Sequence, residues 1–112
     1  MLRVLIVENN RVFREAFKSD LCGHFPSMVI EEGANSEEAL QKIDGTPPQL
    51  IFMDIRLPGL NGLQLTRTIQ AAFPNIHVAI LTGYDLPEYR EASLQYGADH
   101  FFCQRHVRVE RG

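Results

Sequence analysis

The residue that points most directly to chemistry is Asp54, which ends the apolar run LIFM and precedes the turn sequence IRLPGLNG. Such a run is typical of a buried strand, and acidic residues are seldom buried unless their charge is paired. Beside a divalent cation, a carboxylate can act as a nucleophile toward phosphorus and form an aspartyl-phosphate. The following turn is expected to be tight, because Pro58 fixes φ while Gly59 and Gly62 permit conformations closed to other residues.

Polar or small residues also follow the other apolar runs. They are Glu8, Asn9 and Asn10 after VLIV, Arg56 beyond Asp54, Thr82 and Gly83 after HVAIL, and Cys103 and Gln104 after HFF. Carboxylate and carbonyl oxygens are the ligands that Mg²⁺ prefers, and this ion keeps several of its waters. A hydroxyl with neighbouring backbone N–H groups can bind phosphate oxygens during phosphoryl transfer. The residue types therefore predict a magnesium-assisted phosphoryl site, provided that the fold brings them together.

Apolar runs of strand length alternate with helical segments. The runs are 4–7, 28–30, 50–53, 77–81 and 100–102. Within most of these runs, polar residues do not occur at every second position, as expected for strands buried on both faces of a parallel sheet. Apolar residues recur with helical spacing in four segments. Three are 11–22, 63–73 and 86–96, and another begins at Ser36, which is expected to be its N-cap. This order predicts an α/β fold, with ligands bound at the carboxyl ends of the strands.

The composition is that of one folded domain. The chain has 112 residues, of which 45% are hydrophobic and 22% charged, with a net charge of −3. This balance excludes a disordered chain and gives no sign of a nucleic-acid surface, and the first apolar run is too short for a signal peptide or a membrane span. Cys22 and Cys103 are expected to be reduced thiols in or near the core. We expect a cytoplasmic protein that does not bind nucleic acid or membrane.

Four segments in this order and spacing carry a family resemblance: VLIVENN, LIFMDIRLPGLNGLQL, AILTGYD and YGADHFF. Over residues 2–104 the chain resembles the receiver domain of two-component response regulators, and its sequence is most similar to LuxR/NarL-type receivers. The resemblance implies a CheY-like (flavodoxin-like) doubly wound sheet of five parallel strands in the order 2-1-3-4-5. It assigns residues 1–104 to the receiver domain and 105–112 to a C-terminal tail or linker remnant.

The resemblance also assigns roles to the residues around Asp54. Asp54 matches the phosphoacceptor that takes a phosphoryl group from a histidine kinase or phosphotransfer protein. Glu8 and Asn9 occupy the two positions after the first strand at which the family has acidic residues that hold Mg²⁺. Asp54 and the backbone carbonyl of Arg56 complete the ligands that the resemblance implies.

A second group of positions matches the switch of the family. Thr82 corresponds to the hydroxyl that turns toward the phosphoryl group, with Gly83 beside it, and Phe101 corresponds to the rotating aromatic residue. Gln104 stands where the family has a lysine.

Two of these positions depart from the family pattern. Asn9 replaces an aspartate, which removes a negative charge and is expected to weaken Mg²⁺ binding. Gln104 can donate a neutral hydrogen bond but cannot pair its charge with phosphate. Hydrogen bonds to charged groups contribute about 1.5–3 kcal/mol against roughly 1 kcal/mol for neutral ones, and a regulatory coupling as a whole is typically about 1–3 kcal/mol. The switch is therefore expected to be atypical.

The end of the sequence is a third departure. The family closes with a fifth amphipathic helix, whereas QRHVRVERG spaces Val107 and Val109 two residues apart, as in an extended segment. We expect four helices with the fifth missing or truncated. The sheet face left open is expected to favour self-association as a homodimer.

These observations leave two readings of function open. The first is a phosphorylatable receiver with an atypical switch, and the second is a pseudo-receiver that binds partners without phosphate. Neither is an enzyme with a substrate of its own. An aspartate-nucleophile phosphatase of the haloacid dehalogenase kind needs a second acid two residues after the nucleophile, where this chain has Arg56.

Overall fold

A computed structural model of the chain describes residues 1–82 and 87–103. Its centre is a parallel sheet of five strands in the order β2-β1-β3-β4-β5. The strands are β1 (Arg3–Val7), β2 (Val29–Gly33), β3 (Leu50–Asp54), β4 (His77–Thr82) and β5 (His100–Cys103). The helices of the described ranges are α1 (Arg11–His24), α2 (Ser36–Gly45), α3 (Gly62–Ala72) and α4 (Pro87–Gln95). The predicted fold class, strand order and four helices are therefore confirmed.

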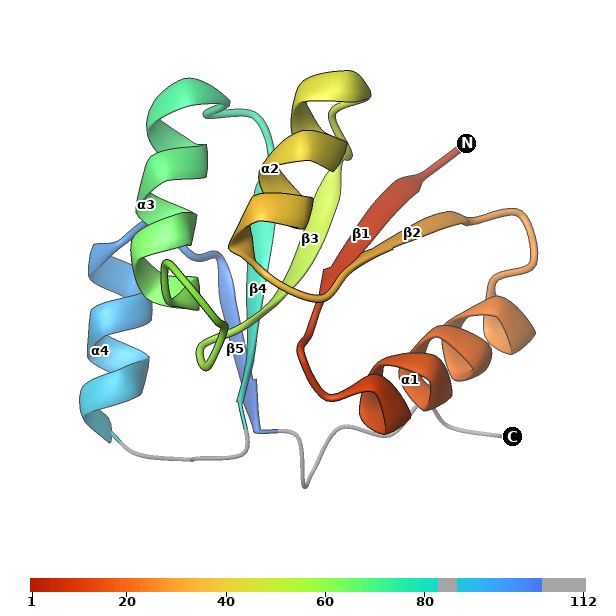
Figure 1. Ribbon diagram of the computed structural model, residues 1–112, viewed down its shortest axis with the longest axis horizontal. Coiled ribbons are helices and arrows are strands. Elements are labelled where there is room, and N and C mark those ends of the chain that lie inside the picture. The colour runs from red at the N-terminus through yellow and green to blue at the C-terminus, as the bar shows by residue number, and fades with distance from the viewer. Residues whose placement is uncertain (83–86, 104–112) are drawn as a thin grey trace.

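The two faces of the sheet are covered unequally. Helices α2, α3 and α4 lie on one face, and α1 lies on the other (Figure 1). The side chains of Val7, Met53 and Ile80 face the three-helix side, where they join the larger core cluster. Ile6 and Leu81 face α1 and contribute to a smaller cluster. The alternation follows from the two-residue period of a strand, which sends successive side chains to opposite faces.

Part of the α1 face holds a hollow of about 470 Å³ over the middle and edge of the sheet. Its lining is mostly apolar and consists of Leu2, Gln49, Leu50, Phe52, His77, Ala79 and His100. Phe17 of α1 packs edge-on against Phe52, one of these lining residues, with ring centroids 5.0 Å apart. The predicted tail 105–112 lies outside the described residues.

Asparagines begin three of the helices. The side chains of Asn10, Asn35 and Asn61 each accept a hydrogen bond from the backbone N–H three residues later. This is the bond that an N-cap residue supplies to an otherwise unpaired N–H group. The expectation that Ser36 caps the second helix is wrong, because Asn35 takes that position and leaves the Ser36 hydroxyl to bond elsewhere.

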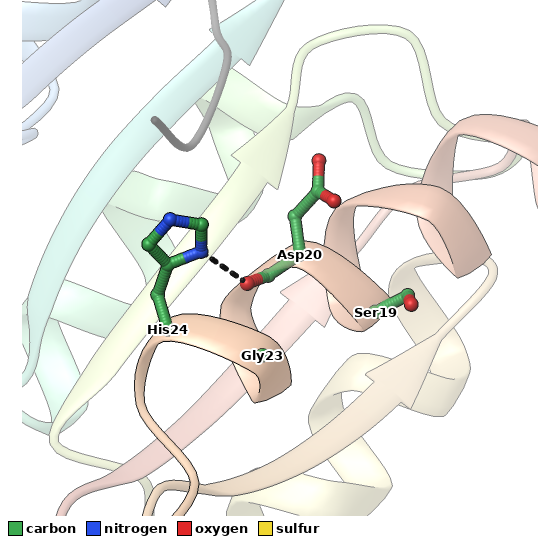
Figure 2. A pocket seen from close by; sticks show the side chains of 4 residues that line it. All are labelled: Ser19, Asp20, Gly23 and His24. Atoms are coloured by element: carbon green, nitrogen blue, oxygen red, sulfur yellow. Dashed lines mark hydrogen bonds between the residues drawn. The ribbon is translucent and has the colours of Figure 1, made fainter. Parts of the chain in front are cut away.

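The C-terminal half of α1 buries Leu21 and exposes its other side. Cys22 is a free, exposed thiol, so its predicted place in or near the core is wrong. Ser19, Asp20, Gly23 and His24 line a shallow hollow there (Figure 2), in which Nδ1 of His24 lies 3.1 Å from the backbone oxygen of Asp20. This hollow lies at the end of α1 away from the carboxyl edge of the sheet. No helix in the described ranges is long and apolar enough to cross a membrane.

Candidate functional site

Two acidic side chains meet at the carboxyl edge of the sheet. Glu8 directly follows β1 and Asp54 ends β3, and these two strands pair so that Val7 lies beside Met53. Glu8 is 2% exposed and Asp54 is 7% exposed. Their side chains hydrogen-bond to each other. We call Glu8 and Asp54 the acidic pair, which the fold assembles from strands that are far apart in the sequence.

The acidic pair is electrostatically strained. Burial, followed by the hydrogen bond and the negative charge of Glu8, raises the pKa of Asp54 to about 8 from its ordinary 3.8. Backbone N–H groups of Arg56 and Ile55 act in the opposite direction but are outweighed. Two neighbouring carboxylates cannot both ionise easily in a site removed from water, so the pair retains a proton near neutral pH.

Backbone and side-chain groups hold the two acids in place. The backbone N–H of Asn10 donates to Oε2 of Glu8 at 2.9 Å, and that of Arg56 donates to Oδ1 of Asp54 at 3.3 Å. Nη1 of Arg14, on α1, donates to the backbone oxygen of Glu8 at 2.8 Å. The first two bonds orient the carboxyl groups, and the third holds the backbone at Glu8.

The turn after Asp54 requires glycine at its end. The N–H of Gly62 donates to the oxygen of Ile55 at 2.8 Å and closes the loop at its base. A Cβ at Gly62 would lie 1.8 Å from the backbone oxygen of Asp54, which no side chain can occupy. Gly59 has φ +83°, a conformation that favours glycine. The expected tight turn is therefore present, and both glycines are necessary to it.

The donor set of the site fits Mg²⁺. The described residues contain no group of three or more His, Cys, Asp and Glu side chains that could hold a metal. Mg²⁺ is usually bound by only one or two carboxylates and keeps several waters, and the acidic pair supplies that number of ligands. A divalent cation would also offset the burial and the repulsion from Glu8 that raise the pKa of Asp54. Glu8 and Asp54 would hold the ion.

The two other predicted metal-binding residues, Asn9 and Arg56, follow Glu8 and Asp54 in the sequence, and a ligand role for the backbone carbonyl of Arg56 stays a prediction. Asn9 is exposed, and its Nδ2 donates to the backbone oxygen of Ala34 at 3.1 Å. The side chain of Arg56 is also exposed, and its backbone N–H contacts Asp54. Asn9 thus uses the one group that distinguishes it from aspartate, its N–H donor, to bond the neighbouring turn.

The predicted switch residues are placed only in part. Thr82 ends β4 and pairs with Cys103 in β5, while the side chain of Thr82, Gly83 and Gln104 all lie outside the described residues. Phe101 is half-buried and packs against the larger core cluster. The guanidinium carbon of Arg90 lies 4.8 Å above its ring, within the range of a cation–π contact.

Sequence reasoning did not single out Arg14 or Glu32, and it gave Ser36 only the role of a helix cap. Arg14 joins the backbone of Glu8 to the carboxylate of Glu32 on β2, with Nε 3.0 Å from Oε1. Burial alone would raise the pKa of Glu32, but hydrogen bonds from Lys18 and Arg14 hold it below its usual value. The signal in the sequence was a basic residue on the first helix and an acid on the second strand, a pattern too common to be specific.

A doubly wound parallel sheet with a buried acidic pair at its carboxyl edge defines the class of protein. The family model for the response regulator receiver domain matches residues 4–105. The chain belongs to this family of signalling domains.

Similar proteins agree with this assignment. The transcriptional regulatory protein DegU of Brevibacillus brevis is 28% identical over 103 residues, which cover 92% of this chain and 44% of that protein. A CheY-like receiver domain of Methanospirillum hungatei is 28% identical with a TM-score of 0.87, covering 97% of this chain and 85% of that one. The receiver domain of a NarL regulator from Mycobacterium tuberculosis is 26% identical with a TM-score of 0.88, covering 97% and 88%. The chain spans less than half the length of the curated relatives it matches.

Proposed function

We propose that this receiver domain accepts a phosphoryl group on Asp54 from a histidine kinase or a phosphotransfer protein. The observation that carries the proposal is the burial of two hydrogen-bonded carboxyl groups, Glu8 and Asp54, at the carboxyl edge of the sheet. Burying two acids together is unfavourable unless a positive partner binds them. Membership of the receiver family supports the choice of a phosphoryl group as the reactant.

The transfer needs Asp54 in its ionised form. An oxygen of Asp54 would form a bond to phosphorus while the bond between phosphorus and the donor's imidazole nitrogen breaks. Mg²⁺, when bound, would neutralise charge on the carboxylates and on the phosphoryl oxygens. The chain's own contribution is to orient Asp54, through the N–H of Arg56, and to hold Glu8 beside it.

The response to phosphorylation is proposed to be atypical. Asn9 lacks the negative charge of the aspartate that the family has at this position, and its amide is bonded to the backbone oxygen of Ala34. Gln104 offers a neutral donor in place of a lysine, which reduces the free energy available to a switch that runs through Thr82 and Phe101. The protein in this account is a signalling module and not an enzyme with a substrate of its own.

One observation favours the second candidate function, a pseudo-receiver that binds partners without phosphate. Asp54 is largely protonated near neutral pH as long as no cation compensates the charge of Glu8. A site with only two carboxylates and the neutral Asn9 could bind Mg²⁺ too weakly to supply that compensation.

Two finer expectations remain proposals. The apolar hollow between Leu50, Phe52 and Ala79 is proposed to support homodimer formation, because a second copy could cover this face. Light scattering that shows a monomer over a wide concentration range would contradict it. The cytoplasmic location also stays a prediction.

Intact-mass spectrometry tests the main proposal. The protein is incubated with acetyl phosphate and Mg²⁺, with Asp54→Ala as the matched control. We expect a phosphoryl mass increment in the wild type that is absent from the variant and absent when Mg²⁺ is chelated. A folded wild-type protein that gains no increment at any Mg²⁺ concentration would support the pseudo-receiver instead.

A further inference from the structure

The segment Ala34–Ser36 runs from the end of β2 to the first residue of α2 and is bonded to the two loops that follow Glu8 and Asp54. We call it the β2–α2 turn. On one side, Nδ2 of Asn9 donates to the oxygen of Ala34 at 3.1 Å. On the other side, Oγ of Ser36 donates to the oxygen of Pro58 at 3.3 Å and accepts from the N–H of Leu60 at 3.2 Å. The turn therefore links the loop after Glu8 with the loop after Asp54.

The hydroxyl of Ser36 serves the loop and not its own helix. Asn35 caps α2, so the helix does not need the Ser36 side chain. Ser36 is 8% exposed, and both its donor and its acceptor are used on the loop 58–60. A buried hydroxyl without partners is costly, so this side chain favours one arrangement of the loop over others.

The loop approaches Ser36 closely. A Cβ at Gly59 would lie 2.9 Å from Oγ of Ser36, so a larger residue would push against the hydroxyl. At its base the same loop is closed by the bond from Gly62 to Ile55. The loop is thus held at its tip by Ser36 and at its base by Ile55, which directly follows β3, and the N–H of Arg56 contacts Asp54.

We propose that Ser36 is a positioning residue for the acidic pair. By fixing Pro58 and Leu60, it holds the loop that orients Asp54, and through Ala34 and Asn9 the same turn holds the loop after Glu8. The two carboxyl groups are thereby kept in the arrangement that a divalent cation binds. This inference rests on the proposed function, because the cation site is that of the phosphoacceptor.

The test is Mg²⁺ binding followed by NMR titration of backbone amides, which needs no phosphoryl donor. Ser36→Ala removes both loop bonds, and we expect Mg²⁺ to bind about three- to tenfold more weakly, as the loss of hydrogen bonds of ordinary strength implies. Ser36→Thr keeps the hydroxyl and is expected to restore most of the affinity. Ser93→Ala is the matched control, since Ser93 is also buried and its hydroxyl donates to the oxygen of Arg90 at 2.8 Å, in α4. That control should leave Mg²⁺ binding unchanged.

A second measurement uses the wild-type protein alone. Hydrogen exchange at the Leu60 amide should be protected without Mg²⁺, because Ser36 accepts that N–H. Mg²⁺ affinity equal in wild type and Ser36→Ala, or a Leu60 amide that exchanges like an exposed one, would overturn the inference and leave the proposed function standing. A wild-type protein that binds no Mg²⁺ would overturn both.

Discussion

The acidic pair and the β2–α2 turn use buried polar groups in opposite ways. Burial, together with the hydrogen bond and negative charge of Glu8, raises the pKa of Asp54, so the two acids destabilise the fold as they ionise. Ser36 is a buried neutral group with both hydrogen-bonding capacities satisfied, so it stabilises its surroundings at every pH. The comparison indicates that the reactive carboxyl groups are held in an unfavourable arrangement by neighbouring groups whose own hydrogen bonds are satisfied.

The largest expected effect comes from removing the charge of the acidic pair. Asp54 binds a proton more tightly in the folded than in the unfolded chain, so stability falls as pH rises from about 4 to about 8, by up to about 1.4 kcal/mol per pH unit. Asp54→Asn should abolish phosphorylation and remove this slope, which makes the variant more stable than the wild type near pH 8. Urea unfolding across pH measures the difference.

The exposed Asp44 on α2 provides the control for this prediction. Asp44→Asn should keep the pH dependence of the wild type. If Asp54→Asn were less stable than the wild type near pH 8, the repulsion between Glu8 and Asp54 would be absent and the comparison would fail.

Mg²⁺ should stabilise the protein more strongly as pH rises. Below about pH 8 the cation must displace a proton from Asp54, and above it the carboxylate is already free. Thermal unfolding with and without Mg²⁺, at about pH 6 and about pH 9, should show the larger shift at the higher pH. Glu8→Gln should greatly reduce both shifts. Equal shifts at the two pH values would argue against binding at the acidic pair.

Asn9→Asp tests whether charge at the acidic pair or the hydrogen bond to the β2–α2 turn matters more for Mg²⁺ binding. The variant gains a carboxylate near the cation but loses the donor that bonds Ala34. The charge should prevail, because interactions with charged groups are worth about 1.5–3 kcal/mol and a neutral hydrogen bond roughly 1 kcal/mol. We expect about tenfold tighter Mg²⁺ binding by calorimetry. Weaker binding would mean that the contact with the β2–α2 turn matters more than charge.

The smallest effect is expected from a contact outside both regions. Arg90→Met removes the cation above the ring of Phe101 and keeps much of the apolar stem. The loss should be about 0.5–1 kcal/mol in unfolding free energy, the value of an exposed cation–π contact. Mg²⁺ affinity should not change. A large change in affinity would show that the acidic pair is coupled to β5 as well as to the turn.

The sequence predicted the elements and the place of the acidic pair well, for physical reasons. VLIV is buried on both faces of the sheet, whereas LIFM is buried on one face and half-buried on the other, and the apolar composition reveals both strands. Parallel strands then bring Glu8 and Asp54 to one edge. The role of Ser36 was misjudged because Asn35 and Ser36 are both good caps, and only the path of the loop at Gly59 decides between them. The contact between Asn9 and Ala34 likewise depends on tertiary distances that no local pattern encodes.

The most direct test of the account is to titrate the side-chain carboxyl groups by ¹³C NMR, without and with Mg²⁺. We expect one carboxyl resonance that titrates near pH 8, is absent from Asp54→Asn and moves to lower pH when Mg²⁺ is added. If every carboxyl group titrates in the ordinary range below about pH 5, and Mg²⁺ shifts none of them, Glu8 and Asp54 do not form the strained, cation-binding pair described above.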